Sequence, residues 1–280
     1  MMRPKVVRPE VAVIRFPGVN CEEETRRALS ASGAESRIVM WNAPADELDA
    51  FDGYVLPGGF SYQDRVRAGA IAAKDAVVGR LIAAAEAGKP ILGICNGAQV
   101  LLESGLVPGL EAGDVEMALA TNTMPDRDGY HSRWCHLRVT SSDSCATLGA
   151  AEGDIWPIPV AHAEGRFVSR TPGLFQSLEA NGQVVLKYAR PDGAAADGFP
   201  ANPNGSTLDV AAVSNRRGNV VAMMPHPERA ARLGQVPTSL AGEWGVGRRR
   251  AAGDDFEKPG PGSGVFTGLV AFARRVRKGA

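Results

Sequence analysis

The sequence is long enough to bury a sizeable core, since 280 residues permit one large domain or two small ones. It carries 31 basic and 31 acidic residues, so the formal net charge of zero gives no reason to expect nucleic acid or an anionic membrane surface as a partner. No apolar run reaches the roughly 20 residues that cross a bilayer, and the basic N-terminus lacks the apolar core of a signal peptide. The cysteines show no Cys-x-x-Cys spacing, and we expect a reduced, cytoplasmic protein. They are Cys21, Cys95, Cys135 and Cys145.

Strands alternate with helices in the first third of the chain, after an N-terminal tail of residues 1–10. Short apolar runs predict strands at 11–16, 36–41, 53–56 and 90–94. A helix is expected after Asn20, which can cap it, and three glutamates in its first turn suit the helix dipole. A long Ala-rich stretch predicts a second helix from Ala68 to Ala87. Such alternation indicates a parallel sheet.

The middle of the chain changes character, with short strands and turns in place of long helices. Strands are predicted at 134–139, 158–161 and 184–188, and they suggest an antiparallel extension of the same sheet. Residues 233–262 are rich in Gly, Pro and Arg and read as a flexible loop before a closing helix at 264–277. We therefore expect a single α/β domain over 11–280, with a twisted, mostly parallel sheet flanked by helices.

The segment from Pro90 to Gln99 carries the most chemical information. It reads as an apolar strand that runs into Cys95 and then directly into a helix. A thiol at that turn faces the free N–H groups of a helix N-terminus, which favour the thiolate. Gly93 and Gly97 allow a tight backbone on either side. This is the pattern of a nucleophile elbow with Cys in place of Ser, although a buried structural cysteine fits the segment equally well.

Two further strand ends support a catalytic interpretation. The strand beginning at Val220 leads to His226 and Glu228, whose i, i+2 spacing lets a carboxylate orient an imidazole. The strand ending at Leu56 runs into Pro57-Gly58-Gly59, a turn that can aim backbone N–H groups into a cavity as an oxyanion hole requires. The carboxyl ends of parallel strands meet at one edge of a sheet, so these groups could form a Cys–His–Glu site for acyl transfer.

The chain resembles the class I glutamine amidotransferases, which place their nucleophile in a Gly-x-Cys-x-Gly-x-Gln elbow. Within that class it is most similar to the glutaminase subunits of phosphoribosylformylglycinamidine synthase. The likeness covers roughly residues 10 to 230. It is carried by the segments at 15–21, 56–62, 67–73, 93–97, 161–167, 204–206 and 223–229.

The resemblance implies a flavodoxin-like fold and hydrolysis of L-glutamine, with the ammonia delivered to a synthetase. It implies Cys95, His226 and Glu228 as the triad, and Gly59 and Asn96 as the oxyanion donors. Candidates for substrate binding are Gly58, Phe60, Arg67, Gln99 and Asn122. No metal or cofactor is expected in this chain, whereas ATP and Mg²⁺ are expected in the synthetase. The implied partners are that synthetase subunit and a small bridging subunit.

Some features leave alternatives open. His162 and Glu164 repeat the His-x-Glu spacing after another apolar run, and Cys21 at a helix start is a second candidate thiol. Gln63 and Arg65 replace the glycine and the aromatic residue that the family commonly has there. The chain could also serve another synthase, be a non-catalytic regulatory subunit, or be a peptidase or γ-glutamyl hydrolase.

Overall fold

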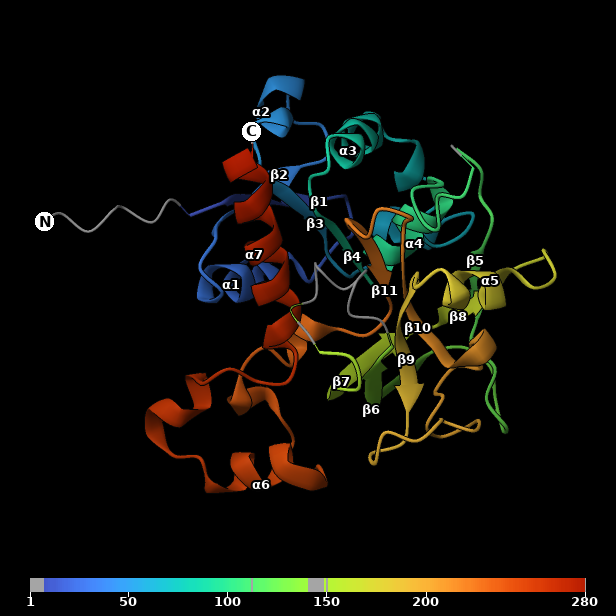
Figure 1. The fold of residues 1–280 in the computed structure, drawn as a ribbon, viewed down its shortest axis with the longest axis vertical. Coiled ribbons are helices and arrows are strands. Elements are labelled where there is room, and N and C mark those ends of the chain that lie inside the picture. The colour runs from blue at the N-terminus through green and yellow to red at the C-terminus, as the bar shows by residue number, and fades with distance from the viewer. Residues whose placement is uncertain (1–7, 112, 141–148, 150, 280) are drawn as a thin grey trace, which may run out of the picture.

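A nine-stranded mixed sheet forms the centre of the molecule (Figure 1). The computed structural model describes residues 8–111, 113–140, 149 and 151–279. The strand order is β2-β1-β3-β4-β11-β10-β9-β6-β7. The bounds of these strands are β1 (Glu10–Arg15), β2 (Glu35–Met40), β3 (Gly53–Leu56), β4 (Ile91–Ile94), β6 (His131–Val139), β7 (Ile155–His162), β9 (Val184–Ala189), β10 (Val210–Ser214) and β11 (Val220–Met223). A separate antiparallel pair joins β5 (Ala118–Thr121) to β8 (Glu164–Val168).

The sheet has a parallel half and an antiparallel half. Strands β2, β1, β3, β4 and β11 pair in parallel, and β10, β9, β6 and β7 continue the sheet in antiparallel fashion. Every residue of β3, β4 and β11 is buried, which explains why these strands read as continuous apolar runs. The expected α/β sheet with an antiparallel extension is confirmed.

Helices cover both faces of the parallel half. Figure 1 shows α1 and α7 side by side against one face, and α3 and α4 on the other. The buried side of α1 consists of Thr25, Ala28 and Leu29, as the helical spacing predicts. The helices are α1 (Glu22–Ala31), α2 (Ala45–Asp49), α3 (Ala76–Glu86), α4 (Asn96–Glu103), α5 (Leu174–Ala180), α6 (Gly242–Arg250) and α7 (Ser263–Gly279).

The long helix expected over Ala68–Ala87 is wrong in its first half. Helix α3 begins only at Ala76, because Asp75 has an extended backbone with ψ 149° and its side chain accepts a hydrogen bond from the Tyr62 hydroxyl at 2.7 Å. Upstream, Gly69 has φ +80°, and a Cβ there would lie 2.7 Å from the backbone of Gln99 on α4. Tight packing on α4 therefore overrides the helix propensity of the alanines.

Two other expectations meet a different structure. The N-cap of α1 is Cys21 rather than Asn20, and Asn20 instead accepts a hydrogen bond from the Cys21 thiol at 3.3 Å. The segment 233–262 contains α6 and the short 3₁₀ helices Leu233–Gln235 and Gly253–Glu257, which project from the sheet in Figure 1. Its predicted flexibility remains a prediction.

Some expectations fall outside the described residues or concern the membrane. Cys145 and most of the predicted tail 1–10 lie outside the described residues. Within the described part of the chain, none of the helices combines the length and the apolar character needed to span a bilayer.

Candidate active site

Cys95 stands on a strained turn between β4 and α4. Its φ of 51° and ψ of −105° are unusual for a residue with a side chain, and such strain is typical of functional sites. The turn is tight because α4 packs directly on the sheet: a Cβ at Gly97 would lie 1.9 Å from the Leu56 carbonyl oxygen. A Cβ at Gly93 would lie 2.6 Å from the Gly97 oxygen. The elbow geometry expected from the sequence is present.

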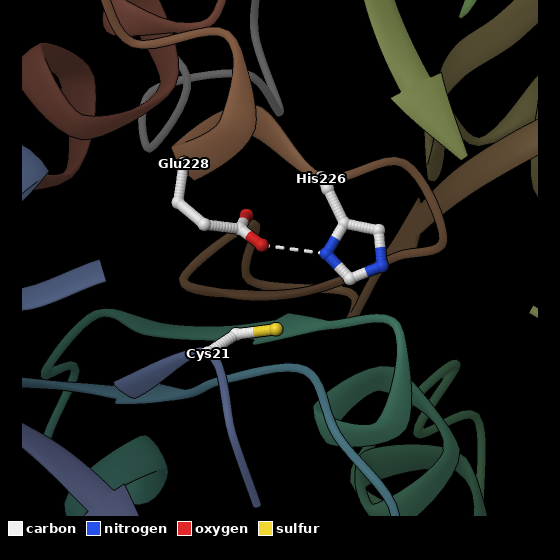
Figure 2. A group of neighbouring side chains, drawn as sticks. All are labelled: Cys21, His226 and Glu228. Atoms are coloured by element: carbon white, nitrogen blue, oxygen red, sulfur yellow. Dashed lines mark hydrogen bonds and ion pairs between the residues drawn. The ribbon is translucent and has the colours of Figure 1, made fainter. Parts of the chain in front are cut away.

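His226 and Glu228 form a buried pair beyond the end of β11 (Figure 2). The His226 backbone N–H donates to the Pro159 carbonyl on β7 at 2.8 Å, which fixes the start of the turn. The Glu228 carboxylate can only accept, so His226 Nδ1 donates to its Oε1 over 2.5 Å. Nε2 is then the nitrogen left for proton transfer, and it is buried without a partner among the described residues.

The surroundings favour the charged form of this imidazole. Burial opposes the charge, but the Glu228 carboxylate and the Cys95 sulfur outweigh it and raise the pKa of His226 well above its usual value. The charged imidazole thus lies beside the Cys95 sulfur. The three groups predicted as a triad therefore lie at one place and support one another electrostatically.

Cys21 is a second thiol at the same imidazole. Figure 2 shows its sulfur facing the His226–Glu228 pair. Its Sγ, a His226 ring nitrogen and a Glu228 oxygen lie within 4.8 Å of one another, which is the one arrangement among the described residues that could hold a metal ion. The Arg229 guanidinium, however, donates to Cys21 Sγ at 3.2 Å and places a cation there already. Cys21 is 1% exposed and does not line the cavity at Cys95.

The glycine turn after β3 is held by the segment that follows β1. The Gly58 carbonyl accepts the Cys21 N–H at 3.2 Å, and Val19 forms a β-bridge with Gly59. Gly59 has φ +148°, and a Cβ there would lie 2.6 Å from the Val19 Cα. At Gly58 a Cβ would lie 2.7 Å from His226 Cε1, so this glycine makes room for the imidazole.

The predicted oxyanion donors are available. Among the described residues, the Gly59 N–H has no hydrogen-bond acceptor. The N–H of Asn96 is the first of α4 and has no partner in the helix. The Asn96 side chain accepts the Ser61 N–H at 3.0 Å and so ties the turn to the elbow. The roles of Gly59 and Asn96 remain predictions that this geometry supports.

A small cavity of 60 Å³ opens at the Cys95 thiol. Phe60 and Gln99 line it, as expected for substrate-binding candidates. Gln99 also donates from Nε2 to the Glu164 carbonyl at 2.7 Å and accepts from Asn96 Nδ2 at 2.9 Å. The cavity is far below the ~300 Å³ at the low end of ligand pockets, so it must widen to admit an amino-acid substrate.

Three other candidates do not line this cavity, and for Gly58, which makes room for the imidazole, contact with a substrate remains a prediction. Arg67 pairs with Glu103 and lines a separate cavity of 440 Å³. Asn122 is fully buried, and its amide bonds within the protein: Nδ2 donates to the His162 carbonyl at 2.7 Å, and Oδ1 accepts the Gly165 N–H at 3.0 Å. Direct contact of either residue with a substrate remains a prediction. In this structure Asn122 holds the corner between β7 and β8.

That corner brings the second His-x-Glu segment to the same cavity. Ala161, His162 and Glu164 line it, and the Cys95 thiol lies 3.7 Å from the Ala161 carbonyl. Burial, with His226 nearby, lowers the pKa of His162 to about 3, so this imidazole is neutral. His162 also lies beside Asn122 rather than Glu164, with 3.1 Å between Nδ1 and Oδ1. The two pairs therefore differ: Glu228 orients a charged His226, whereas Glu164 does not hold His162.

Asp64 is the one titratable residue lining this cavity that the candidates from the sequence omit. It lies on the 3₁₀ turn Ser61–Asp64 after the glycine turn, and its carboxylate accepts from Asn96 Nδ2 at 3.3 Å. Burial and the nearby Glu164 raise its pKa to about 6. The Ser-Tyr-Gly-Asp pattern of the resembled family, which contains an aspartate at this place, was the signal that could have identified it.

Comparison with known proteins agrees with this geometry. Residues 8–254 match the family model of the CobB/CobQ-like glutamine amidotransferase domain, the class of protein that the sheet, the elbow and the His–Glu pair define. The phosphoribosylformylglycinamidine synthase subunit PurQ of Methanothrix thermoacetophila is 45% identical over 256 residues, which cover 89% of this chain and 97% of that protein. The chain therefore belongs to the family of PurQ subunits of phosphoribosylformylglycinamidine synthase.

Other relatives support the same family. The PurQ subunit of Halobacterium salinarum is 43% identical over 220 residues, 79% of this chain and 91% of that protein. A chain in the solved structure of PurLQS from Thermotoga maritima is similar over 94% of this chain and 98% of its own length. That similarity has a TM-score of 0.69 and 31% sequence identity.

Proposed function

We propose that this chain hydrolyses the side-chain amide of L-glutamine and supplies the ammonia to a synthetase that converts formylglycinamide ribonucleotide to formylglycinamidine ribonucleotide in purine biosynthesis. The observation that carries the proposal is the position of Cys95: its thiol stands on a strained elbow, lines the cavity and adjoins the imidazole of a His–Glu pair. Membership of the PurQ family names the pathway.

The first half of the reaction uses the charged pair at the elbow. The Cys95 thiolate attacks the amide carbon, and the resulting oxyanion accepts hydrogen bonds from the N–H groups of Gly59 and Asn96. His226 gives its Nε2 proton to the amide nitrogen, the C–N bond breaks, and ammonia departs. A glutamyl thioester then remains on Cys95. Loss of one oxyanion donor typically raises the barrier by about 2.7–4 kcal/mol.

The second half releases glutamate. His226, now neutral, takes a proton from a water molecule that attacks the thioester carbon. The C–S bond breaks, glutamate leaves, and the thiolate–imidazolium pair is restored. Throughout the cycle Glu228 keeps Nδ1 protonated, so that Nε2 is always the nitrogen that exchanges the proton.

Partners and location follow from the same proposal. We infer that the chain assembles with a synthetase subunit and a small bridging subunit, because its solved relative is named PurLQS. ATP and Mg²⁺ belong to the synthetase in this proposal, and the assembly works in the cytoplasm.

Trapping the intermediate tests the nucleophile directly. The assembled complex is mixed with L-glutamine, quenched in acid and digested, and the peptides are examined by mass spectrometry for a glutamyl adduct. The proposal expects the adduct on the Cys95 peptide, and expects it to persist in a Cys21→Ala variant. An adduct on Cys21, or none in the active complex, would refute the assignment.

A further inference from the structure

Cys21 is a buried thiol beside the triad that the reaction described above does not use. It is 1% exposed, and its sulfur faces the His226–Glu228 pair (Figure 2). The backbone is fixed on both sides of this residue. Its N–H donates to the Gly58 carbonyl at 3.2 Å, and its carbonyl accepts a hydrogen bond from the Thr25 hydroxyl at 2.7 Å. The sulfur therefore has a defined place beside the pair.

The Cys21 sulfur holds the guanidinium group of Arg229. Arg229 Nη2 donates to Cys21 Sγ at 3.2 Å, and the thiol in turn donates to Asn20 Oδ1 at 3.3 Å. In this position Arg229 Nε lies 3.8 Å from Glu228 Oε1, a distance that permits an ion pair but is too long for a hydrogen bond. The guanidinium thus lies next to the triad carboxylate without donating to it.

Glu228 could accept a further donor. Its Oε1 accepts from His226 Nδ1 at 2.5 Å, whereas its Oε2 is buried and has no hydrogen-bond partner among the described residues. A guanidinium group favours paired hydrogen bonds to a carboxylate, because its N–H groups form a planar fork that matches the two oxygens. An Arg229 side chain released from Cys21 would therefore compete with His226 for the charge of Glu228.

We propose that Cys21 is a positioning residue: it holds the Arg229 guanidinium and so reserves the Glu228 carboxylate for His226. This inference rests on the proposed glutaminase activity and gives the second thiol a part in it without contact with the substrate. The part requires only an acceptor of the Arg229 hydrogen bond, so an oxygen in place of the sulfur should also perform it.

Charged and titratable groups face His226 from four parts of the fold. They are Glu228 and Arg229 on its own turn, Cys21 at the start of α1, Cys95 at the elbow before α4, and His162 at the end of β7. Against the cost of burial, the carboxylate and the two sulfurs favour the charged imidazole and raise the pKa of His226. A guanidinium hydrogen-bonded to Glu228 would cancel part of this effect and lower that pKa.

The test removes the sulfur and the guanidinium separately and together. Glutamate release from L-glutamine by the assembled complex is measured as a function of pH. The variants are Cys21→Ala, Cys21→Ser, Arg229→Gln and the double variant of Cys21→Ala with Arg229→Gln. Cys135→Ala is the matched control, because Cys135 is also a buried cysteine, at 4% exposure, and does not line the cavity. Melting temperatures confirm that each variant is folded.

The proposal expects an effect on kcat that depends on Arg229. Cys21→Ala should lower kcat about 10-fold, the size of one charge-assisted hydrogen bond, with KM unchanged. The falling limb of its kcat–pH profile should move to lower pH, because the imidazolium is lost earlier as pH rises. Cys21→Ser should keep most of the activity, and Cys135→Ala should change neither kcat nor the limb.

The double variant decides whether Cys21 acts through Arg229. Adding Arg229→Gln to Cys21→Ala should restore most of kcat and return the falling limb toward its wild-type position, because no guanidinium then competes for Glu228. Arg229→Gln alone should not move the limb to lower pH. An unmoved limb in Cys21→Ala, or a loss that Arg229→Gln does not restore, would overturn the proposal.

A titration without substrate separates this proposal from the proposed activity. The full chain contains four histidines, so isotope-labelled histidine lets nuclear magnetic resonance follow the His226 ring, whose signal is assigned by its absence in His226→Asn. His226 should lose its proton at lower pH in Cys21→Ala than in wild type, and at a higher pH again in the double variant. This result would support the proposal even if wild type released no ammonia. The same titration in wild type and Cys21→Ala would overturn it, whatever the activity.

Discussion

At the scale of single residues, the site depends on charges that the fold holds in unfavourable surroundings. His226 is charged in a place that excludes water, because Glu228 and the Cys95 sulfur outweigh the cost of burial. Asp64 retains a carboxylate in the substrate cavity, although burial and Glu164 oppose its ionisation. Perturbed titratable groups in a small cavity are typical of catalytic sites.

The substitution Glu228→Gln should show how much of this depends on one carboxylate. The amide keeps the shape of the side chain but loses its charge, so burial dominates and the pKa of His226 falls. We expect kcat to fall about 10²-fold or more, and the falling limb of the kcat–pH profile to move to lower pH, because the imidazolium is lost earlier as pH rises. A kcat–pH profile with its limb unchanged would contradict the assignment of Glu228.

Asp64→Asn should stabilise the free chain. The pKa of Asp64 is about 6 in the folded state and about 3.9 in an unfolded chain, so folding becomes less favourable as pH rises from about 4 to 6. The residue is partly exposed, so solvent screening reduces the effect to about 1 kcal/mol, or about 2–4 °C in melting temperature. Thermal unfolding of the variant should match wild type below pH 4 and exceed it above pH 6. Equal melting temperatures of the variant and wild type at pH 7.5 would show that the ionised Asp64 carboxylate does not destabilise the fold.

At the scale of secondary-structure elements, the turn after β3 is where this chain departs from its family. Tyr62, Gln63, Asp64 and Val66 all have positive φ values, between 52° and 72°, which side chains other than glycine adopt at a cost. The family commonly has glycine at the position of Gln63, where such a backbone is free of that cost. The run lies directly beside Phe60 and the oxyanion turn, so its strain acts on the substrate cavity.

Gln63→Gly should therefore raise stability. The glycine removes about 1–2 kcal/mol of left-handed strain and costs about 0.5–1 kcal/mol of chain entropy, so the net gain should be about 0.5–1 kcal/mol. The gain is measured as an increase in the urea midpoint of unfolding. Gln63→Ala is the matched control, since it removes the same polar group but keeps the Cβ. If Gln63→Ala raised stability by the same amount, the gain would come from loss of the glutamine side chain and not from relief of backbone strain.

The sequence predicts the site residues that directly follow the end of a strand. Cys95, the His226–Glu228 pair and the Gly58–Gly59 turn each follow an apolar run, and a parallel sheet brings such ends together. Residues 161–164 line the cavity because β7 and β8 pair with strands that are distant in the sequence. The His-x-Glu spacing alone does not show this pairing, so it could not decide whether His162 or His226 is the catalytic histidine. Close packing of Gly69 on α4 likewise limits how early α3 can begin, and the sequence of the Ala-rich stretch does not show this packing.

At the scale of the whole molecule, the cavity suggests why this chain needs partners. A volume of 60 Å³ at the thiol is too small for glutamine, and Phe60 at its wall is 47% exposed. We expect docking of the synthetase to move the 60–66 segment and widen the cavity. If the synthetase binds the form with the widened cavity more tightly, it raises the population of that form and therefore the rate of glutamine hydrolysis. The isolated chain should have low activity under this account.

The most direct test of the account measures glutamate release from L-glutamine by wild type and by Cys95→Ala, each alone and in the complex loaded with nucleotide. The account predicts slow release by the isolated wild-type chain, a large stimulation in the complex, and no release by Cys95→Ala under either condition. Release that persists in Cys95→Ala would contradict the assignment of the nucleophile. Absence of release in every sample would contradict the glutaminase function and favour a regulatory subunit with the same fold.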